Sequence, residues 1–296
     1  MSYVVTGAAG QVGSAVVDYL LAKSVPVRVV IRSENKAESF RSRHIDVVLA
    51  DLTDTDALTK AFQGAKAVFA MNPPAMSHPD LQVAAVNVSR ALASAIKAAN
   101  VERVIVLSSV GGERSSKTGN ILTTYTMEEA LKTSASQVVM VRAAWFTENW
   151  LNAVSAVKSG QSPVLGSMLQ KLDRKIPHIA TDDIGRVSAE YMTKPKNELD
   201  NLVVIELEGP EPYSPNDVAQ VTGEIIGKPV QAFAMTETMI RDLIGRFGWP
   251  KTSADLWIEL FQGLDDNTIR WAEDGKFLRI KGKVGLNEVL SKSSLH

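Results

Sequence analysis

The sequence of 296 residues contains no cysteine. This excludes disulfide bonds, thiolate nucleophiles, zinc–cysteine sites and iron–sulfur clusters. Histidine is scarce too, since the chain has only His44, His78, His178 and His296, and none of them stands at the spacing of a metal-binding motif such as HExxH. A metal site could be built only from carboxylates, and nothing in the sequence supports one.

The sequence also lacks an apolar run of the roughly 18 residues that a membrane-spanning helix needs. The first strand-like segment begins at Tyr3, which leaves no room for a signal peptide. We therefore expect a cytoplasmic protein with no membrane partner. Lys and Arg total 32 against 33 Asp and Glu, a net charge of −1, so no surplus of positive charge favours nucleic acid as a partner.

What the chain does have is a regular alternation of short apolar runs and amphipathic stretches. The composition, 45% hydrophobic and 22% charged, is typical of a globular protein. Strands without strict polar alternation are typical of a parallel sheet buried on both faces, and strands separated by helices predict a doubly wound α/β fold with helices on both faces. The predicted strands are Tyr3–Val5, Val27–Ile31, Asp46–Ala50, Ala67–Met71, Arg103–Leu107 and Val138–Arg142; the predicted helices are Gln11–Ala22, Asp56–Phe62, Leu81–Ala99 and Thr124–Thr133.

After Arg142 the alternation becomes irregular. We expect a turn region at Gly160–Gly166, an exposed charged loop at Lys171–Lys175 and a mostly helical tail from Thr236 onward. The predicted organisation is a first domain over residues 1–150 and a smaller, mixed and mostly helical lobe over residues 151–296, with the strand at 202–207 returning to the main sheet. Exposed helix faces leave the choice between monomer and homodimer open.

The strongest chemical signal is the glycine turn at residues 6–13, Thr-Gly-Ala-Ala-Gly-Gln-Val-Gly, between the first strand and the first helix. Gly7 permits a tight turn, Gly10 lets the backbone approach a diphosphate, and Gly13 lets the helix pack closely on the strand. The free N–H groups at the start of the helix would then point at the phosphates. This context predicts a dinucleotide-binding Rossmann domain, with a purely structural turn as the alternative.

The end of the second strand indicates which dinucleotide. An acidic residue there would bind the 2′-hydroxyl of NAD(H), whereas a cation suits the 2′-phosphate of NADP(H). The sequence has Arg32 and Ser33 at this position, a planar fork of donors and a hydroxyl. NADP(H) is therefore favoured over NAD(H), the alternative being that Arg32 is an ordinary surface arginine.

Over roughly residues 1–210 the chain resembles the NmrA-like group of atypical short-chain dehydrogenases. The resemblance rests on the glycine turn, Arg32, Ala50-Asp51-Leu52, Asn72-Pro73-Pro74, Trp145-Phe146-Thr147-Glu148-Asn149 and Asp182-Asp183-Ile184-Gly185. That group includes quinone reductases, azo and triphenylmethane-dye reductases, isoflavone-type reductases, and regulators that bind the cofactor without turning it over. The resemblance is specific for the family and much less so for one activity.

The resemblance also implies which residues bind the cofactor. It places Gly7, Gly10, Gln11 and Val12 on the diphosphate, with Thr6 beside them, Arg32 and Ser33 on the 2′-phosphate, Asp51 and Leu52 beside the adenine, and Met71, Asn72, Pro73 and Ser108 toward the nicotinamide. Two of these assignments have structural alternatives. Asp51 could cap the helix that follows it, and Pro73 could end a strand because proline cannot donate to the sheet.

The catalytic group stays unassigned, with Ser108 and Tyr125 as candidates. A short-chain dehydrogenase normally has a serine after strand five and a Tyr-xxx-Lys pair whose lysine lowers the pKa of the tyrosine. Ser108 is at the serine position, but four residues after Tyr125 stands Glu129, and a carboxylate would tend to raise the tyrosine pKa. Tyr125 is equally explained as a helix residue half buried against the sheet.

Planar acceptors such as quinones and azo dyes accept hydride readily, so positioning can replace a strong general acid. Trp145, Phe146 and Asn149 follow a strand at its carboxyl end, where open α/β folds bind ligands, although an aromatic cluster there could equally be lobe core. Further walls could come from the lobe: Met168, Phe247, Trp249 and Trp257. The leading hypothesis is an NADPH-dependent oxidoreductase acting on a small planar acceptor. The alternatives are an NADP(H)-sensing regulator and, disfavoured by Glu129, a sugar-nucleotide epimerase.

Overall fold

A computed structural model describes residues 1–273 and 275–292, so His296 lies outside the described residues. Its centre is an eight-stranded sheet in which each pair of neighbouring strands is parallel, in the order β13-β10-β6-β5-β4-β1-β2-β3. The strands are β1 Ser2–Thr6, β2 Val27–Ile31, β3 Asp46–Leu49, β4 Ala65–Ala70, β5 Arg103–Ser109, β6 Gln137–Ala143, β10 Leu202–Glu208 and β13 Leu278–Lys281. The order reverses at β1, as it does in a doubly wound sheet.

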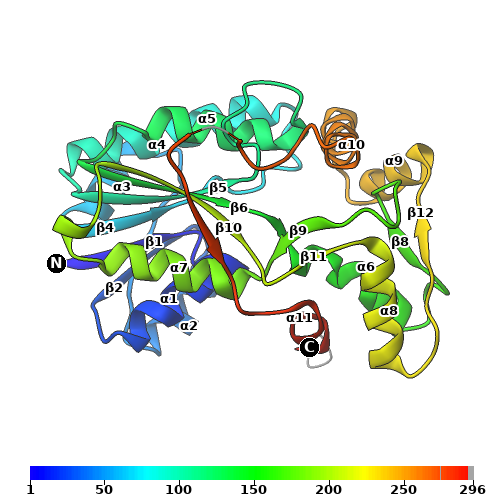
Figure 1. Ribbon diagram of the computed structural model, residues 1–296. Helices are drawn as coiled ribbons and strands as arrows, with labels where there is room; N and C mark the ends of the chain where they lie inside the picture. The colour runs from blue at the N-terminus through cyan, green and yellow to red at the C-terminus, as the bar shows by residue number, and fades with distance from the viewer. Residues whose placement is uncertain (274, 293–296) are drawn as a thin grey trace.

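Both faces of this sheet are buried because alternate residues of its central strands enter two separate cores. On one face the sheet is covered by α1 (Gln11–Ala22), α2 (Ala37–Arg41) and α7 (Thr181–Thr193), and on the other by α3 (Thr55–Phe62), α4 (Leu81–Ala98) and α5 (Leu122–Leu131) (Figure 1). This arrangement explains why the strand sequences are apolar without alternation. The predicted fold class is confirmed.

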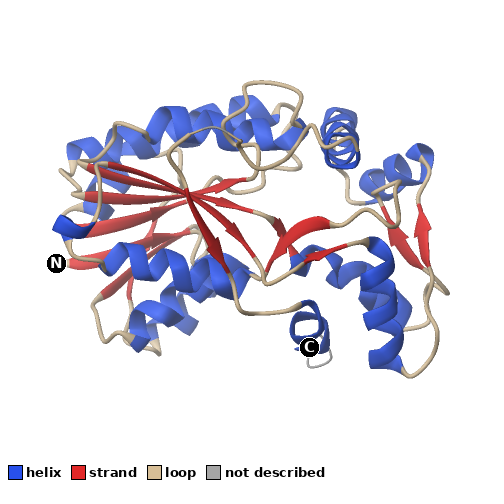
Figure 2. Cartoon of the chain, viewed as in Figure 1, coloured by secondary structure: helices blue, strands red, loops and turns tan. Residues whose placement is uncertain are grey.

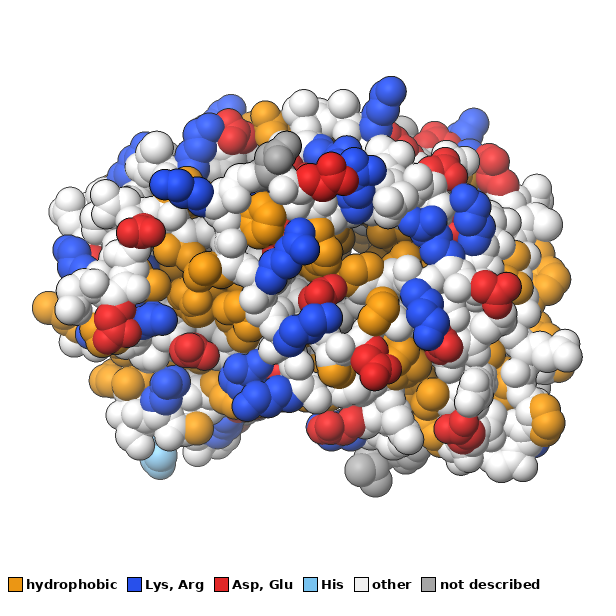
Figure 3. Space-filling model, in the orientation of Figure 1, with side chains coloured by type: hydrophobic (Ala, Val, Ile, Leu, Met, Phe, Trp, Pro, Cys, Tyr) orange, Lys and Arg blue, Asp and Glu red, His pale blue; other side chains and the backbone are white. Residues whose placement is uncertain are grey.

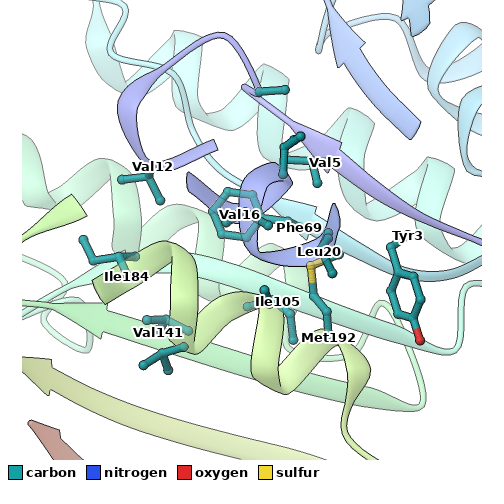
Figure 4. Packing of buried hydrophobic residues seen from close by; sticks show 14 of the residues in the cluster. Tyr3, Val5, Val12, Val16, Leu20, Phe69, Ile105, Val141, Ile184 and Met192 are labelled. Atoms are coloured by element: carbon teal, nitrogen blue, oxygen red, sulfur yellow. The ribbon is translucent and has the colours of Figure 1, made fainter. Parts of the chain in front are cut away.

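The first core is tightest where α1 and α7 pack together over the sheet. Figure 4 shows side chains of both helices in one cluster with those of the central strands: Val16 and Leu20 of α1, Ile184 and Met192 of α7, and Phe69, Ile105 and Val141 of the sheet. Asp183, in the first turn of α7, is 1% exposed and accepts hydrogen bonds from the backbone N–H groups of Lys283 and Val284 at 2.7 and 2.8 Å. α7 therefore also anchors the segment that follows β13.

The smaller part of the molecule lies beyond the carboxyl ends of the central strands, to which their arrowheads point in Figure 2. It consists of a three-stranded sheet in the order β11-β9-β7, a two-stranded sheet β12-β8, and five helices among the described residues. The elements are β7 Trp145–Phe146, β8 Leu165–Ser167, β9 Ile176–Ile179, β11 Pro212–Tyr213, β12 Ala232–Ala234, α6 Leu151–Lys158, α8 Pro215–Ile226, α9 Glu237–Arg246, α10 Lys251–Asp265 and α11 Leu286–Lys292.

Every strand and helix predicted before Arg142 is present, with bounds within two or three residues of those expected. The short α2 was not predicted, and neither were the strands of the smaller part. β8 begins at Leu165, inside the segment expected to be a turn region, and the mostly helical tail also contributes β13, the edge strand of the main sheet. Lys171–Lys175 is a loop, as predicted.

None of the helices in residues 1–273 and 275–292 is both long and apolar enough to cross a membrane. On the face of the molecule shown in Figure 3, basic and acidic side chains are interspersed, with apolar side chains between them. Neither positive nor negative side chains dominate that face.

Candidate active site

The glycine turn joins β1 to α1 in the geometry that a diphosphate site requires. Gly7 has φ +63°, the left-handed conformation that favours glycine, and the Gly10 N–H donates to the Gly7 carbonyl at 2.9 Å. A Cβ on Gly13 would stand 2.2 Å from the Gly7 carbonyl oxygen, so only glycine lets the helix pack this closely on the turn. Gly10 caps α1 without a side-chain hydrogen bond, which leaves the N–H groups of the first turn available to an anion.

Two contacts bring the end of β4 against this turn. The Thr6 hydroxyl is fully buried and donates to the Phe69 carbonyl at 3.0 Å. A Cβ on Gly7 would stand 2.7 Å from the Met71 sulfur. The side chain of Thr6 thus ties β1 to β4, and Met71 lies directly beside the glycine turn.

Arg32 and Ser33 are exposed at the carboxyl end of β2. Among the described residues, Arg32 has no carboxylate within ion-pair distance, whereas its neighbours are paired: Arg28 with Asp46, Arg41 with Glu34 and Arg43 with Asp18. The Arg32 guanidinium is thus free to bind a phosphate.

Asp51 follows β3 and lies close enough to Arg32 to feel its charge. Both the N–H and the hydroxyl of Thr53 donate to the Asp51 carboxylate, at 2.9 and 2.7 Å, and these bonds, with the charge of Arg32, hold the Asp51 pKa below its usual range. Asp54, not Asp51, caps α3, by accepting from the Ala57 N–H at 3.0 Å. Leu52 is 8% exposed and packs into the second core.

A cavity of about 740 Å³ begins beside the glycine turn and runs into the smaller part of the molecule. We call its first part the turn end, lined by Gln11, Met71, Asn72 and Pro73, and its second part the lobe end, lined by Trp145, Phe146, Asn149, Trp249 and Trp257; Ser108 lines the wall as well. The cavity brings together these predicted residues from β4, β5, β7 and the tail. The other predicted residues do not line it: Thr6, Gly7, Gly10, Val12, Arg32, Ser33, Asp51, Leu52, Tyr125, Met168 and Phe247.

The aromatic side chains of the lobe end are both wall and core. Trp145 meets Trp257 edge-on with ring centroids 6.2 Å apart, and it meets Phe261 edge-on at 5.3 Å. Trp145 and Trp257 pack against the lobe core and also line the cavity. The same aromatic cluster therefore forms part of the cavity wall and part of the lobe core.

Ser108 belongs to a buried charged network beneath the cavity. Its hydroxyl donates to a Glu128 carboxylate oxygen at 2.6 Å, and Arg142 binds both oxygens of that carboxylate, at 2.9 and 2.8 Å. Arg142 also lies 3.2 Å from Glu113. The hydrogen bonds and charge of Glu128 outweigh the desolvation of Arg142 and raise the guanidinium pKa. The Ser108 proton is thus held by a carboxylate, which leaves the oxygen lone pairs to face a ligand.

Tyr125 lies on α5, half buried and outside the cavity wall. Glu129, at the position where a dehydrogenase would have lysine, pairs with Lys132 at 2.6 Å. The two neighbours Thr123 and Thr124 do line the cavity, but Tyr125 does not. Nothing in this arrangement equips Tyr125 to exchange a proton with a ligand.

The loop after β6 is held in place by two groups whose role was not predicted. Glu148 accepts from the N–H and hydroxyl of Thr181 at 2.9 and 2.7 Å, and burial raises the Glu148 pKa. The Trp150 indole donates to Nε2 of His178 at 2.9 Å, and burial lowers the pKa of His178 to about 4. His178 is therefore neutral at physiological pH, with Nδ1 donating to the Ile176 carbonyl at 2.9 Å.

Several cavity residues were missed because they come from segments with no motif of their own. The expected exposed loop supplies two cations, and the helical tail and β13 supply the rest: Arg174, Lys175, Arg270, Trp271 and Arg279. A charged loop looks the same in a sequence whether it faces solvent or a cavity. Within the described ranges, no three His, Asp or Glu side chains are grouped as metal ligands.

Comparisons with known proteins agree with this geometry. Residues 2–271 match the model of the NmrA-like family. The chain is 26% identical to an NAD(P)H azoreductase of Xenophilus azovorans over 87% of this chain and 85% of that protein, and 26% identical to quinone oxidoreductase 2 of Escherichia coli K12 over 85% and 84%. The solved structure of Citrobacter sp. triphenylmethane reductase complexed with NADP(H) superposes with a TM-score of 0.79 at 19% identity, covering 99% of this chain and 100% of that one.

Proposed function

The chain belongs to the NmrA-like family, and from this premise we propose that it is an NADPH-dependent oxidoreductase that reduces a small planar acceptor, of the quinone, azo or dye type. The observation that carries the proposal is the continuous cavity, which joins the glycine turn to an aromatic pocket. A cofactor at the turn end would place its nicotinamide toward a compartment with flat apolar walls, where an acceptor can lie against it. Two relatives found by sequence, an NAD(P)H azoreductase and a quinone oxidoreductase, are named for the reduction of such acceptors, which supports the proposal.

The residues at the turn end fit NADPH. The uncapped N–H groups of α1 suit the diphosphate, and the unpaired guanidinium of Arg32 suits the 2′-phosphate. Met71, Asn72 and Pro73 would line the path toward the nicotinamide. When bound, NADPH would supply a hydride from C4 of its nicotinamide; the chain itself would hold and orient both reactants.

We assign Ser108 to orienting the cofactor and not to donating a proton. Its hydroxyl hydrogen is committed at 2.6 Å to Glu128, which is itself held by Arg142. Releasing that proton would leave a carboxylate of a buried ion pair without its donor, which is costly. A quinone that accepts a hydride needs one proton to leave as a hydroquinone, and water entering the cavity would supply it.

The direct test is steady NADPH oxidation with menadione, a neutral azo dye and a triphenylmethane dye. Turnover above the rate without protein, lost in a variant that cannot bind the cofactor, supports the reductase. NADPH binding without turnover of any acceptor would instead support the second candidate, a cofactor-sensing regulator. The specific observation that favours the regulator is the position of Tyr125 outside the cavity wall, since no Tyr-xxx-Lys pair serves the site.

A further inference from the structure

The charged side chains that line the cavity are of one sign. Among the lining residues that the structure describes there is no Asp or Glu, while four cations contribute to the wall: Arg174, Lys175, Arg270 and Arg279. The rest of the lining is apolar, aromatic or uncharged polar. Apolar walls strengthen the field of a charge beside them, so a ligand in this cavity experiences a positive potential.

Three of the four cations are balanced by carboxylates outside the wall. The nitrogen–oxygen distances are 3.4 Å for Lys175 with Asp217, 3.1 Å for Arg270 with Glu273, and 3.0 Å for Arg279 with Glu206. Their charges are therefore largely compensated within the protein.

Arg174 is the exception within the described part of the chain, where no carboxylate lies at ion-pair distance from it. Within the same described residues, the polar contact of its side chain is from Nη2 to the side-chain oxygen of Asn267 at 2.9 Å, which holds the guanidinium against the segment after α10. Its Nε is buried and has no hydrogen-bond partner. A buried donor on a charged group is costly to leave unpaired, so the guanidinium is suited to an acceptor supplied by a ligand.

Trp257, a second residue of the cavity wall, also has a buried donor with no partner among the described residues. The indole Nε1 of Trp257 is buried without a partner, and its ring stacks on Phe261 with centroids 5.7 Å apart and an angle of 21° between planes. Trp145 lines the same cavity with its ring at 86° to that of Trp257, so the two rings give the lobe end an aromatic lining. The cavity wall thus combines aromatic surface with two side chains, Arg174 and Trp257, that each have a buried donor without an acceptor in the described part of the chain.

We propose that the preferred acceptor is a flat aromatic molecule that carries an anionic group, a carboxylate or sulfonate, and that Arg174 binds this group through its guanidinium. This inference rests on the proposed reductase function and adds the charge of the substrate to it. The planar fork of arginine matches two oxygens of such a group. Positively charged dyes are poor ligands of the same cavity, because they meet the guanidinium of Arg174, which has no ion pair among the described residues, and no lining carboxylate.

Binding of two matched probes that cannot be reduced tests the anion site separately from catalysis. Naphthalene sulfonate and the neutral naphthalene sulfonamide are titrated by calorimetry into the protein saturated with NADP⁺. The sulfonate binds at least about tenfold more tightly to the natural protein, as expected for a charge-assisted contact. Equal affinities for the two probes would overturn the proposal, and this comparison needs no variant.

Arg174→Gln identifies the residue responsible. The variant loses the preference, with sulfonate affinity falling roughly tenfold and sulfonamide affinity changing less than about twofold. Arg270→Gln is the matched control in the same wall: its charge is already paired with Glu273, so sulfonate affinity falls less than about threefold. A preference unchanged in Arg174→Gln, or an equal loss in both variants, would contradict the assignment. So would a weaker affinity of Arg174→Gln for NADPH, since Arg174 would then belong to the cofactor site.

Kinetics with naphthoquinone and naphthoquinone sulfonate separate this inference from the proposed function. Each quinone takes one hydride from NADPH and one proton from water and leaves as a hydroquinone. In Arg174→Gln the KM for the quinone sulfonate should rise. The ratio of kcat/KM for the sulfonate to kcat/KM for the neutral quinone should therefore fall. Turnover of both quinones with a ratio unaffected by Arg174→Gln overturns the inference and leaves the reductase intact. No turnover of either quinone, with the sulfonate probe still preferred, overturns the reductase and leaves the anion site.

Discussion

The two ends of the cavity are built in different ways. The turn end is made from short segments at the carboxyl ends of β1 and β4, which are neighbours in the sheet, and its main feature is the backbone of a single turn at residues 6–13. The lobe end and the cations beside it are assembled from side chains of β7, the loop before β9, α10 and the segment before β13, which together extend over more than 120 residues of the chain. One end depends on local backbone geometry, the other on how distant elements pack.

Because the two ends are built differently, we expect them to have different roles, one in binding the cofactor and the other in binding the acceptor. A diphosphate is bound by N–H groups that any sequence with the right glycines can present, so the turn end determines the class of cofactor. In the proposed complex the acceptor would contact side chains such as Trp145 and Arg174, each of which can be replaced without disturbing a glycine turn. We therefore expect specificity for the acceptor to depend on the lobe end and the cations beside it.

Gly13→Ala tests the turn end and has the largest expected effect. The added Cβ would stand 2.2 Å from the backbone oxygen of Gly7, so the turn and the helix must move apart. We expect NADPH affinity to fall by at least about 100-fold and the free energy of unfolding by roughly 1–3 kcal/mol. Calorimetric titration and urea denaturation measure the two effects.

Gly245→Ala is the matched control, since nothing lies within 4 Å of a Cβ built on this glycine of α9. It should leave NADPH binding unchanged and raise the free energy of unfolding by roughly 0.5–1 kcal/mol through helix propensity. An unchanged NADPH affinity in Gly13→Ala would show that the cofactor does not depend on the close approach of turn and helix.

His178 tests the lobe end through pH. Burial lowers its pKa to about 4 from 6.5, so between these values the unfolded chain binds a proton that the folded protein does not. The contribution to stability is complete above pH 6.5 and is lost as the pH falls toward 4, a total of about 3 kcal/mol. His178→Gln removes the titrating group, so its free energy of unfolding should fall less steeply than that of the natural protein over this range.

The control for this measurement is His44→Asn. His44 is exposed and has φ +57°, a conformation that Asn tolerates. This variant should keep the pH dependence of the natural protein. Denaturation curves at several pH values compare the three proteins, and identical slopes for all of them would exclude His178 as the source.

Arg32→Ala returns to the turn end and tests the choice of cofactor. Removing an unpaired guanidinium from the 2′-phosphate should weaken NADPH binding by about 2 kcal/mol, roughly thirtyfold, and leave NADH binding unchanged. Arg41→Ala, next along the same surface but paired with Glu34, should change neither affinity by more than about twofold. Equal losses for NADPH and NADH in Arg32→Ala would mean that Arg32 does not contact the 2′-phosphate.

The turn end was predictable because each of its features is local. A glycine turn between a strand and a helix, and a cation at the end of the next strand, are visible in a few consecutive residues. The two-sided burial of the sheet was equally visible, since the strands of the first half are mainly apolar and lack strict polar alternation.

The aromatic residues and Asn149 of the lobe end were expected beside a ligand, but the cations of the cavity wall were not, because they gain their role only from packing. Arg174 and Lys175 belong to a segment that reads as a solvated loop, and Arg279 lies on an edge strand inside an apparently helical tail. The buried network of Ser108, Glu128 and Arg142 depends on the register of β5 with β6 and on the position of α5. No spacing in the sequence indicates those contacts.

Tyr125→Phe is the smallest expected change and it bears on both ends of the cavity. If positioning supplies the rate, removing a hydroxyl that lies outside the cavity wall should alter kcat/KM for a quinone by less than about twofold. Ser108→Ala is the matched comparison from the cavity wall: it removes the lone pairs that would orient the nicotinamide, and it leaves one Glu128 oxygen without its donor, so it should raise the Kd for NADPH several-fold. A loss of about 100-fold or more in Tyr125→Phe would instead identify a general acid, because that is the range of proton transfer by a positioned side chain. It would also require α5 to move toward the cavity when both reactants are bound, since Tyr125 does not line the cavity as the protein stands.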